Sequence, residues 1–296
     1  MTTLDGSATP IGIPERPEEA RIARKERIRL LLRSPTFIFG CALFGIWVVC
    51  AIFGTLIAPH SPQADDVLNK LVSPSGDHLF GTDRLGRDVL SRVIVGARGI
   101  LVIALAATVI GTALGTVIGL VTGYFRGLVD EGIMRLVDTL LSIPLIITAL
   151  LAVVALGPSR LTLILVIGIA FAPIIAKTVR AAVLGERELE YAQAARLRSE
   201  RAPYIMFAEI LPNVSAPIIV EFTVRLGYAI FTIATLSFLG FGADPSIPDW
   251  GNDISEHYQF INGGVWWAVL FPSLAIATLI VGINLVADAI EQSYER

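Results

Sequence analysis

The stretch ILVIALAATVIGTALGTVIGLVTGY, residues 100–124, holds 25 consecutive residues without a single charge. A helix of roughly 20 apolar residues is long enough to cross a hydrocarbon core about 30 Å thick. Lipid offers the backbone no hydrogen-bond partner, so a spanning segment must satisfy its own N–H and C=O groups as a helix. This stretch therefore predicts a transmembrane helix and a membrane-embedded fold.

The composition of the whole chain agrees with that prediction. Of 296 residues, 54% are hydrophobic and 17% are charged, whereas soluble domains carry about 25% charged residues. Five further apolar blocks have lengths suited to a span: 36–56, 136–156, 161–179, 214–240 and 265–290. We therefore expect an all-α membrane protein with six transmembrane helices. The apolar blocks indicate a lipid bilayer as the surroundings, and the net charge of −3 shows no basic surplus that would suggest nucleic acid as a partner.

The distribution of Lys and Arg predicts the orientation of these spans. Residues 1–35 form a polar N-terminal segment that carries seven basic residues: Arg16, Arg21, Arg24, Lys25, Arg27, Arg29 and Arg33. Cytoplasmic segments carry an excess of Lys and Arg, and six spans return the chain to its starting side. We therefore expect both termini in the cytoplasm, a transmembrane domain over 36–296, and a cytoplasmic loop over 180–213.

Two long loops are then expected on the outer side. Residues 60–99 are rich in proline and aspartate, and residues 241–264 contain acidic residues but no Lys or Arg. All three histidines, His60, His78 and His257, fall in these loops. We interpret them as ordinary polar loop residues, with metal ligation or pH sensing as the alternative. The sequence contains no recognisable metal-binding motif, so no metal site is predicted from a motif.

Two patterns stand out within the predicted spans. Four glycines recur every fourth residue and so share one helix face: Gly111, Gly115, Gly119 and Gly123. Such a face allows close helix–helix packing in lipid, either within the chain or at the seam of a gate. In the fifth span, Glu221 and Arg225 lie four residues apart, which predicts a salt bridge or, alternatively, a pair that lines a cavity.

The cytoplasmic loop contains a charged, alanine-rich stretch, EYAQAARLRSERAPYIMFAEILPN, residues 190–213. Its first half favours a helix. Ala192, Ala195 and Ser199 would form one small face on it, so another surface could come close to the backbone, and the whole stretch is shaped to contact a partner protein. Pro203 suits the first turn of a second helix, and Pro212 ends it. No phosphate-binding loop is present, so energy for any transport would have to come from another protein.

Residues 190–213 resemble the EAA loop of permease subunits from ATP-binding-cassette importers. The match rests on Glu190, Ala194, Ala195, Ile210, Leu211, Pro212 and Asn213. The segments HLFGTDRLGRDVLSRVIVGAR (78–98), GYFRGLVDEGIMRLVDTLLSIP (123–144) and LSFLGFGADPSIPDWGNDI (236–254) resemble the C-type permease of dipeptide, oligopeptide and nickel importers. The resemblance covers about residues 33–288 and implies the type I importer permease fold.

Two departures from the family pattern are visible. Ser199 stands where the family has glycine, and the ending NLVADAIEQSYER lacks the family's glycines and its final acidic-proline element. We expect that position 199 needs only a small side chain. If it needs a positive φ instead, serine costs about 1 kcal/mol there.

The resemblance also implies a mechanism and partners. This chain and a homologous B-type permease would form the pathway in a bacterial plasma membrane. Two cytoplasmic ATPase subunits would bind ATP and Mg²⁺, since this chain has no cofactor of its own, and an extracytoplasmic protein would deliver substrate. The coupling residues would be Glu190, Tyr191, Gln193, Ala194, Ala195, Arg196, Leu197, Arg198 and Ser199, followed by Ile210, Leu211 and Pro212 at the end of the loop.

Other functions remain open at this point. An ATP-independent secondary transporter or channel would need ion-coupling carboxylates at mid-span, and a membrane scaffold or receptor would have no pathway. Peptides are the expected substrate, with nickel chelates or haem as alternatives. The chain is not expected to be an enzyme, because no ATPase or other catalytic motif is present.

Overall fold

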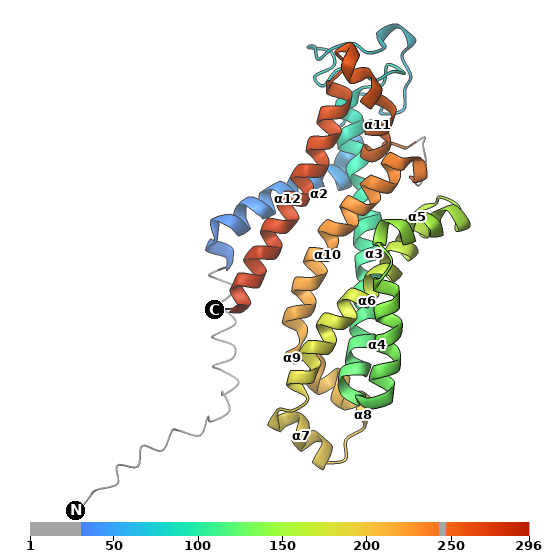
Figure 1. The fold of residues 1–296 in the computed structure, drawn as a ribbon. Helices are drawn as coiled ribbons and strands as arrows, with labels where there is room; N and C mark the ends of the chain where they lie inside the picture. The colour runs from blue at the N-terminus through green and yellow to red at the C-terminus, as the bar shows by residue number, and fades with distance from the viewer. Residues whose placement is uncertain (1–30, 243–246, 296) are drawn as a thin grey trace, which may run out of the picture.

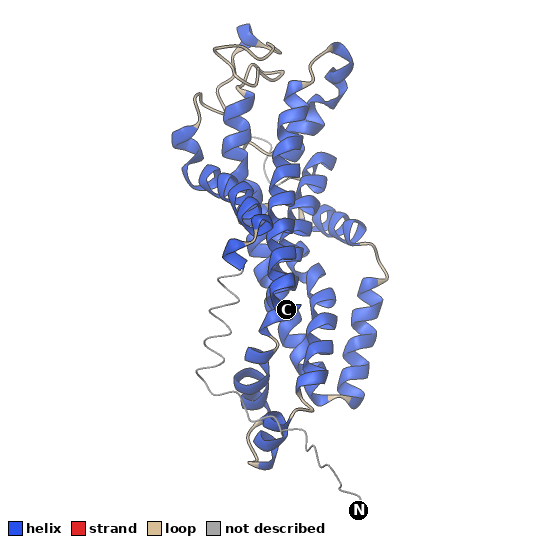
Figure 2. Ribbon diagram, turned by 90° about the vertical axis from the view of Figure 1, so that its left-hand side faces the viewer, coloured by secondary structure: helices blue, strands red, loops and turns tan. Residues whose placement is uncertain are grey.

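The computed structural model describes residues 31–242 and 247–295, and within these ranges it contains helices and loops but no strand (Figures 1 and 2). The long helices are α2 (Pro35–Ile57), α3 (Val89–Phe125), α4 (Gly127–Leu141), α5 (Leu145–Leu156), α6 (Arg160–Glu186), α10 (Ser215–Leu236) and α12 (Trp267–Glu295). The short elements are η1 (Val67–Asn69), α7 (Glu190–Leu197), α8 (Ala202–Tyr204), η2 (Ile205–Ile210), α9 (Leu211–Asn213), η3 (Ser237–Phe241), α11 (Trp250–His257) and η4 (Tyr258–Gly263). Apart from residues 31–35, the predicted N-terminal segment lies outside the described residues.

Five helices of the described chain are long and apolar enough to cross a membrane: α2, α3, α6, α10 continued through η3, and α12. A sixth span results if the bent pair of α4 and α5 is counted as one. The prediction of an all-α membrane protein is therefore confirmed, and the number of candidate spans is five or six.

The third predicted span differs from the expected straight helix. The chain breaks between α4 and α5, whose axes meet at 85°. Pro144 lies at this break and begins α5 as its N-cap. Proline has no N–H to donate and disfavours helical backbone in the residue before it, so a helix through Ile143 and Pro144 cannot continue regularly. The prediction of one continuous helix over 136–156 was wrong for this reason.

The first outer loop is also shorter than predicted. Helix α3 begins at Val89 instead of residue 100, because the Asp88 side chain caps it by accepting a hydrogen bond from the Ser91 N–H. The loop therefore covers 58–88, and residues 89–99 are helical. At 37 residues, α3 is about 55 Å long at 1.5 Å per residue, which exceeds the hydrocarbon thickness.

The glycine face of α3 packs against α6. A Cβ atom placed on Gly115 would lie 2.6 Å from Ile175 Cβ, and one placed on Gly119 would lie 2.7 Å from Val179 Cβ. Gly111 and Gly123 have equally close neighbours on α6. These distances leave no room for a side chain, so the four glycines allow two backbones of the same chain to touch. Packing within the chain, one of the two predicted roles, is the one the structure supports.

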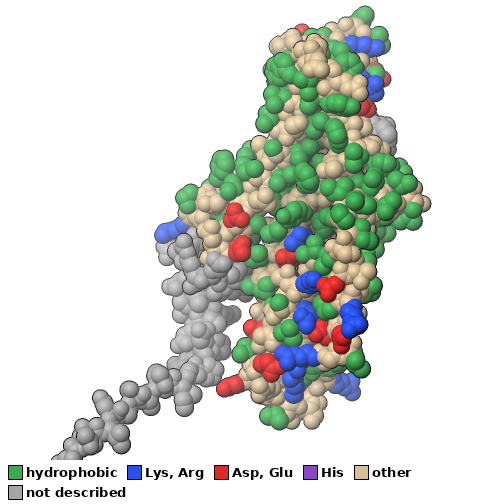
Figure 3. All heavy atoms as spheres, viewed as in Figure 1, with side chains coloured by type: hydrophobic (Ala, Val, Ile, Leu, Met, Phe, Trp, Pro, Cys, Tyr) green, Lys and Arg blue, Asp and Glu red, His purple; other side chains and the backbone are tan. Residues whose placement is uncertain are grey.

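Figure 1 shows how the helices are arranged around α3. At one end of the molecule, α2 and α12 pack with the first part of α3, beside the loop 58–88 and α11. At the other end, α4, α6 and α7 surround its last turns. Figure 3 shows that hydrophobic side chains cover most of the middle of the visible face, while charged side chains of both signs gather around α4, α6 and α7.

Candidate functional site

Helix α7 lies at one extreme end of the molecule, below α6 and α10 in Figure 1. It begins four residues after α6 ends and is followed by the helical run α8–η2–α9, which leads into α10. The two short helical segments expected over 190–213 are therefore present, but Pro212 does not end the second one, since it lies inside α9 (Leu211–Asn213) in the first turn, where proline is tolerated. The second contains the π-helical turn η2, a feature that is frequent at functional sites.

The end of α7 is a Schellman motif centred on Ser199. Ser199 N donates to Arg196 O at 2.9 Å and Glu200 N donates to Ala195 O at 3.2 Å. Ser199 has φ +56°, the left-handed conformation that glycine adopts without strain. The expectation that position 199 needs only a small side chain was therefore wrong. The position requires a positive φ because the motif reverses the chain there.

The small face of α7 is buried inside the chain itself. Ala192 and Ala195 have no exposed surface, and α7 packs on η2, where Ile205 and Ile210 are also buried. A surface does come close to this face, as predicted, but it is η2 of the same chain. The alanines bring α7 close to its own neighbouring segment, so Ala195 acts by positioning the helix.

Polar contacts attach α7 to α6 and α3. Arg187 donates through Nη1 to Tyr124 O at 2.6 Å, one of the last carbonyls of α3, and Tyr191 donates through its hydroxyl to Glu186 Oε2 at 2.7 Å. Burial, reinforced by Glu186, raises the pKa of Tyr191, so the hydroxyl stays protonated as a donor. Arg196, expected on the charged rim, instead lies with its guanidinium 5.1 Å from the centre of the Tyr124 ring.

The outward face of α7 has a different composition. Glu190, Gln193 and Leu197 are exposed and follow the spacing i, i+3, i+7, so they share one side of the helix. Leu197 is 87% exposed. Arg198 is exposed as well and lies 3.6 Å from Glu209, while Ala194 is half-buried. At the end of the loop Ile210 is buried, Leu211 half-buried and Pro212 exposed. The face available to another protein is therefore the one built around Leu197.

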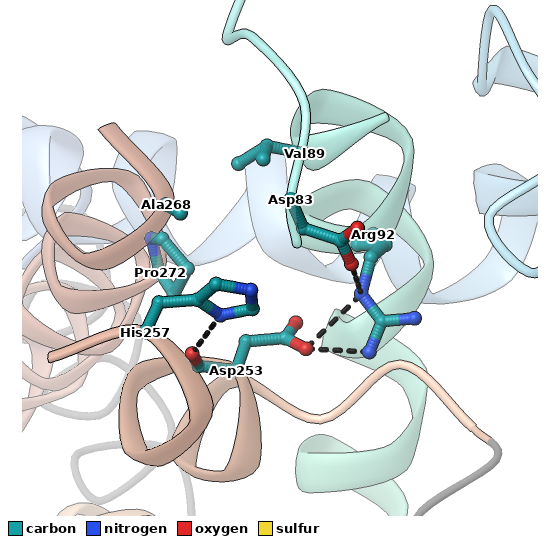
Figure 4. A pocket seen from close by; sticks show the side chains of 7 residues that line it. All are labelled: Asp83, Val89, Arg92, Asp253, His257, Ala268 and Pro272. Atoms are coloured by element: carbon teal, nitrogen blue, oxygen red, sulfur yellow. Dashed lines mark hydrogen bonds and ion pairs between the residues drawn. The ribbon is translucent and has the colours of Figure 1, made fainter. Parts of the chain in front are cut away.

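The opposite end of the molecule holds a buried ion network, shown in Figure 4. Arg92 of α3 donates to Asp253 Oδ1 of α11 through Nε at 3.0 Å and through Nη2 at 2.5 Å. Asp83 Oδ2 lies 3.9 Å from Arg92 Nε and 2.6 Å from Arg87 Nε. The side chains of Arg92 and Asp253 are only 2% and 5% exposed, so this pair is almost fully removed from water.

A cavity of about 10 Å³ lies within this network and is lined by Asp83, Val89, Arg92, Asp253, His257, Ala268 and Pro272 (Figure 4). This volume is close to the minimum that holds one water molecule. Asp253 Oδ2 has no hydrogen-bond partner within the described chain. One water in the cavity would satisfy this oxygen, but the space is too small for a transported molecule.

The three histidines separate into two environments. His257 accepts a hydrogen bond from Arg84 N at Nε2, so its Nδ1 carries the proton that is donated to Asp253 O at 2.6 Å. Both ring nitrogens are thus used in ordinary hydrogen bonds. His60 and His78 instead lie with ring centres 4.8 Å apart, next to Asp88.

Two tryptophans bind α11 and the loop 58–88 to the long helices. Trp250 of α11 donates to Val93 O at 2.9 Å, and Trp267 of α12 donates to Thr82 O at 3.0 Å. Asp249 caps α11 by accepting from Asn252 N, and burial raises the pKa of its carboxyl while these hydrogen bonds oppose the shift. The loop expected over 241–264 therefore contains a helix that is packed onto the chain.

In α10, Glu221 and Arg225 form the predicted salt bridge, with 2.7 Å between Oε1 and Nε. Both side chains are largely buried, at 12% and 16% exposed, and Arg225 also lies 5.1 Å from the centre of the Tyr228 ring. The structure therefore supports the paired interpretation of these two charges.

The Arg92–Asp253 pair was not predicted from the sequence. The alternating Asp and Arg residues over 83–92 were visible as a signal, but the partner lies 161 positions away. Sequence spacing alone carries no information about a contact at that separation.

Two family models match the chain. The one described as binding-protein-dependent transport system inner membrane component matches residues 115–296. The one described as N-terminal TM domain of oligopeptide transport permease C matches residues 24–74.

Relatives of similar length share about a third of their residues with this chain. It is 35% identical over 271 residues to the dipeptide transport system permease protein DppC of Alkalihalophilus pseudofirmus, covering 92% of this chain and 89% of that protein. It is 38% identical over 270 residues to the protein of the same name from Escherichia coli K12, covering 89% of each. It is 37% identical over 265 residues to the di/tripeptide transport system permease protein DppC of Pseudomonas aeruginosa, covering 86% of each.

One solved structure has a related fold. A chain of the MetNI methionine ABC transporter, in an inward-facing conformation, superimposes with a TM-score of 0.56 over 69% of this chain and 97% of its own. At 19% identity, this likeness shows that the two chains share a fold.

Proposed function

Because this chain belongs to the family of binding-protein-dependent transport system inner membrane components, we propose that it forms half of the translocation pathway of an ATP-driven peptide importer. A homologous B-type permease forms the other half. Two cytoplasmic ATPase subunits bind ATP and Mg²⁺, and an extracytoplasmic protein delivers the substrate. Both termini then lie in the cytoplasm, on the same side of the bacterial inner membrane as α7.

The observation that carries this proposal is the exposed leucine of a helix held between two long membrane helices. Leu197 projects from α7, and α7 joins α6 directly and α10 through η2. Full burial of a leucine side chain is worth about 1.5–3 kcal/mol, which is about a tenfold or greater gain in affinity. A groove in an ATPase subunit that receives Leu197 would therefore hold α7 firmly.

The contacts behind α7 are suited to transmit movement. Arg187, the C-cap of α6, ties the chain before α7 to the end of α3, and Ala192 and Ala195 of α7 are fully buried where α7 packs on η2. Interiors packed this closely are poorly compressible and transmit displacement. A push on Leu197 would therefore move α6 and α10 as rigid bodies, in the rocking motion by which transporters alternate access.

Peptides are the substrate class best supported. The relatives described above are named as dipeptide or di/tripeptide permeases, and this favours peptides over nickel chelates or haem. Ion-coupled transport without ATP has less support. Glu221, the one acidic residue of α10, is already paired with Arg225 and is not free to bind a coupling ion.

The direct test replaces the exposed leucine, and the chain offers a matched control. Leu197→Asp should reduce ATP-dependent uptake of a radiolabelled dipeptide at least about tenfold, because a carboxylate cannot occupy an apolar groove. Leu128→Asp is the control, since Leu128 of α4 is also 87% exposed. Uptake would be measured in membranes that contain this chain together with its ATPase and binding-protein partners.

The amount of each variant in the membrane must equal that of the unmodified chain. Loss of uptake and of ATPase co-purification in Leu197→Asp alone supports the proposal. Normal uptake by Leu197→Asp, with normal recovery of the ATPase subunits, would contradict it.

A further inference from the structure

His60, His78 and Asp88 converge at the outer end of the bundle, and we propose that they bind one Zn²⁺ ion. One ligand atom from each residue lies within 4.8 Å of the other two. His60 follows the end of α2, His78 lies in the loop 58–88, and Asp88 is the N-cap of α3. The three groups therefore come from the start, the middle and the last residue of the loop 58–88, which the fold brings together.

The distances suit a tetrahedral ion. Zn²⁺ binds imidazole nitrogen and carboxylate oxygen at about 2.0–2.1 Å, which places neighbouring ligands of a tetrahedron about 3.3 Å apart. Asp88 Oδ1 lies 2.9 Å from His78 Nδ1 and 3.7 Å from His60 Nδ1. These two separations lie on either side of the ideal value. The ligand nitrogens of the two histidines lie within 4.8 Å of each other, so rotation of the rings would have to bring them closer to admit the ion.

The carboxylate is already oriented for this task. Asp88 Oδ2 accepts hydrogen bonds from Ser91 N at 2.8 Å and from Ser91 Oγ at 2.7 Å, which leaves Oδ1 directed at the histidines. Ser91 Oγ in turn accepts from His60 N at 3.1 Å. Hydrogen bonds of this kind, from groups behind the ligands, hold the ligands of established metal sites in place.

The types of ligand favour zinc over calcium or magnesium. Two imidazole nitrogens and one carboxylate oxygen form the donor set of several zinc sites with three protein ligands, whereas Ca²⁺ and Mg²⁺ prefer oxygen alone. Asp88 is 1% exposed, His78 16% and His60 44%. The ion could therefore enter from the side of His60, and a water molecule could complete its coordination there.

Bound Zn²⁺ would cross-link the start and the middle of the loop 58–88 to the N-cap of α3. In its absence, His78 Nδ1 and Asp88 Oδ1 are within hydrogen-bond distance, and the ion would displace the proton between them. The consequence is a metal-dependent order of the loop 58–88, which forms part of the outer surface.

The test titrates Zn²⁺ into the full-length chain, purified in detergent with a tag that lacks histidine and stripped of metal by a chelator. Calorimetry would give the affinity, and elemental analysis after desalting would give the stoichiometry. We expect about one Zn²⁺ per chain for the unmodified protein. Asp77→Asn is the matched control, because Asp77 is exposed and adjacent to His78 but outside the cluster.

Each ligand is then replaced by a side chain of similar shape: His60→Gln, His78→Gln and Asp88→Asn. Asparagine still caps a helix, so α3 should keep its start in the third variant. We expect the affinity for Zn²⁺ to fall at least about tenfold in each and to stay unchanged in Asp77→Asn. Co²⁺ bound to the unmodified chain should show the visible absorption of a tetrahedral ion, and His78→Gln should lose it.

Two results would overturn the proposal. One is the absence of saturable binding near one Zn²⁺ per chain. The other is binding by His60→Gln and His78→Gln with the affinity of the unmodified chain, which would place the ion elsewhere.

Discussion

Two sites at opposite ends of this molecule differ in the exposure of their charged side chains. At the end that carries α11, here called the outer end because we propose that it faces away from the cytoplasm, Arg92 and Asp253 are paired and almost fully buried, and Trp250 binds α11 to α3. At the end that carries α7, here called the inner end for the same reason, Glu190 and Leu197 of this helix and the adjacent Arg198 are exposed.

This difference in exposure distinguishes a region whose contacts are made within the chain from a surface that is open to contact with another protein. A buried ion pair joins two elements in one geometry, since moving them apart would leave charges unpaired in a dry site. An exposed leucine on a short helix has no such contact within its own chain. We infer that the outer end is held rigid by its own residues, whereas α7 gains its final contacts in an assembly.

The largest expected effect comes from breaking the outer pair. Asp253→Ala leaves the Arg92 guanidinium buried without its partner, which should lower the free energy of unfolding by about 3–5 kcal/mol. Thermal unfolding of the purified protein in detergent would measure the loss.

The double variant Arg92→Met with Asp253→Leu provides the control for this prediction. It removes both charges and keeps apolar volume, so most of the lost stability should return. If Asp253→Ala unfolds at the same temperature as the unmodified chain, the outer end is not held by this pair.

A smaller loss of stability is expected from a larger side chain at the buried contact between α7 and η2. Ala195→Leu introduces three carbon atoms where Ala195 has no exposed surface, and such overpacking should cost about 1–3 kcal/mol. Ala194→Leu is the neighbouring control, because Ala194 is only half-buried. Thermal unfolding should separate the two variants. Equal stability would mean that α7 is not packed against η2 in the protein.

The smallest effect concerns the strained turn after α7. Ser199→Gly should stabilise the protein by up to about 1 kcal/mol, because glycine adopts φ +56° without the strain that a side chain causes. Ser199→Ala keeps a Cβ atom and should show no gain. A loss of stability in Ser199→Gly would show that the serine side chain, and not the backbone, matters at this position.

Several elements could be predicted from local sequence alone. The apolar blocks 36–56 and 161–179 correspond to α2 and α6, and the resemblance in residues 190–213 led to the correct family. These predictions succeed because the length of an apolar run, helix propensity and a motif are all properties of neighbouring residues.

Other predictions failed where the outcome depends on how helical segments pack against one another. The α7 stretch was expected to contact a partner protein, but η2 of the same chain covers its small face, because an alanine face does not indicate which surface it meets. The failed prediction of a continuous span over 136–156 has a different cause. Pro144, where the helix breaks, was a local signal in the sequence, and the prediction did not use it.

The sequence by itself determined that this chain crosses a membrane as helices, since lipid leaves an apolar run no other way to satisfy its backbone. It also determined that the glycines at 111–123 form one face, because residues four apart in a helix align. Only the tertiary structure decided that α6 fills this face, that Arg92 meets Asp253, and that His60 and His78 flank Asp88. Those contacts join residues far apart in the chain, and their energies depend on burial that exists only after the helices have packed.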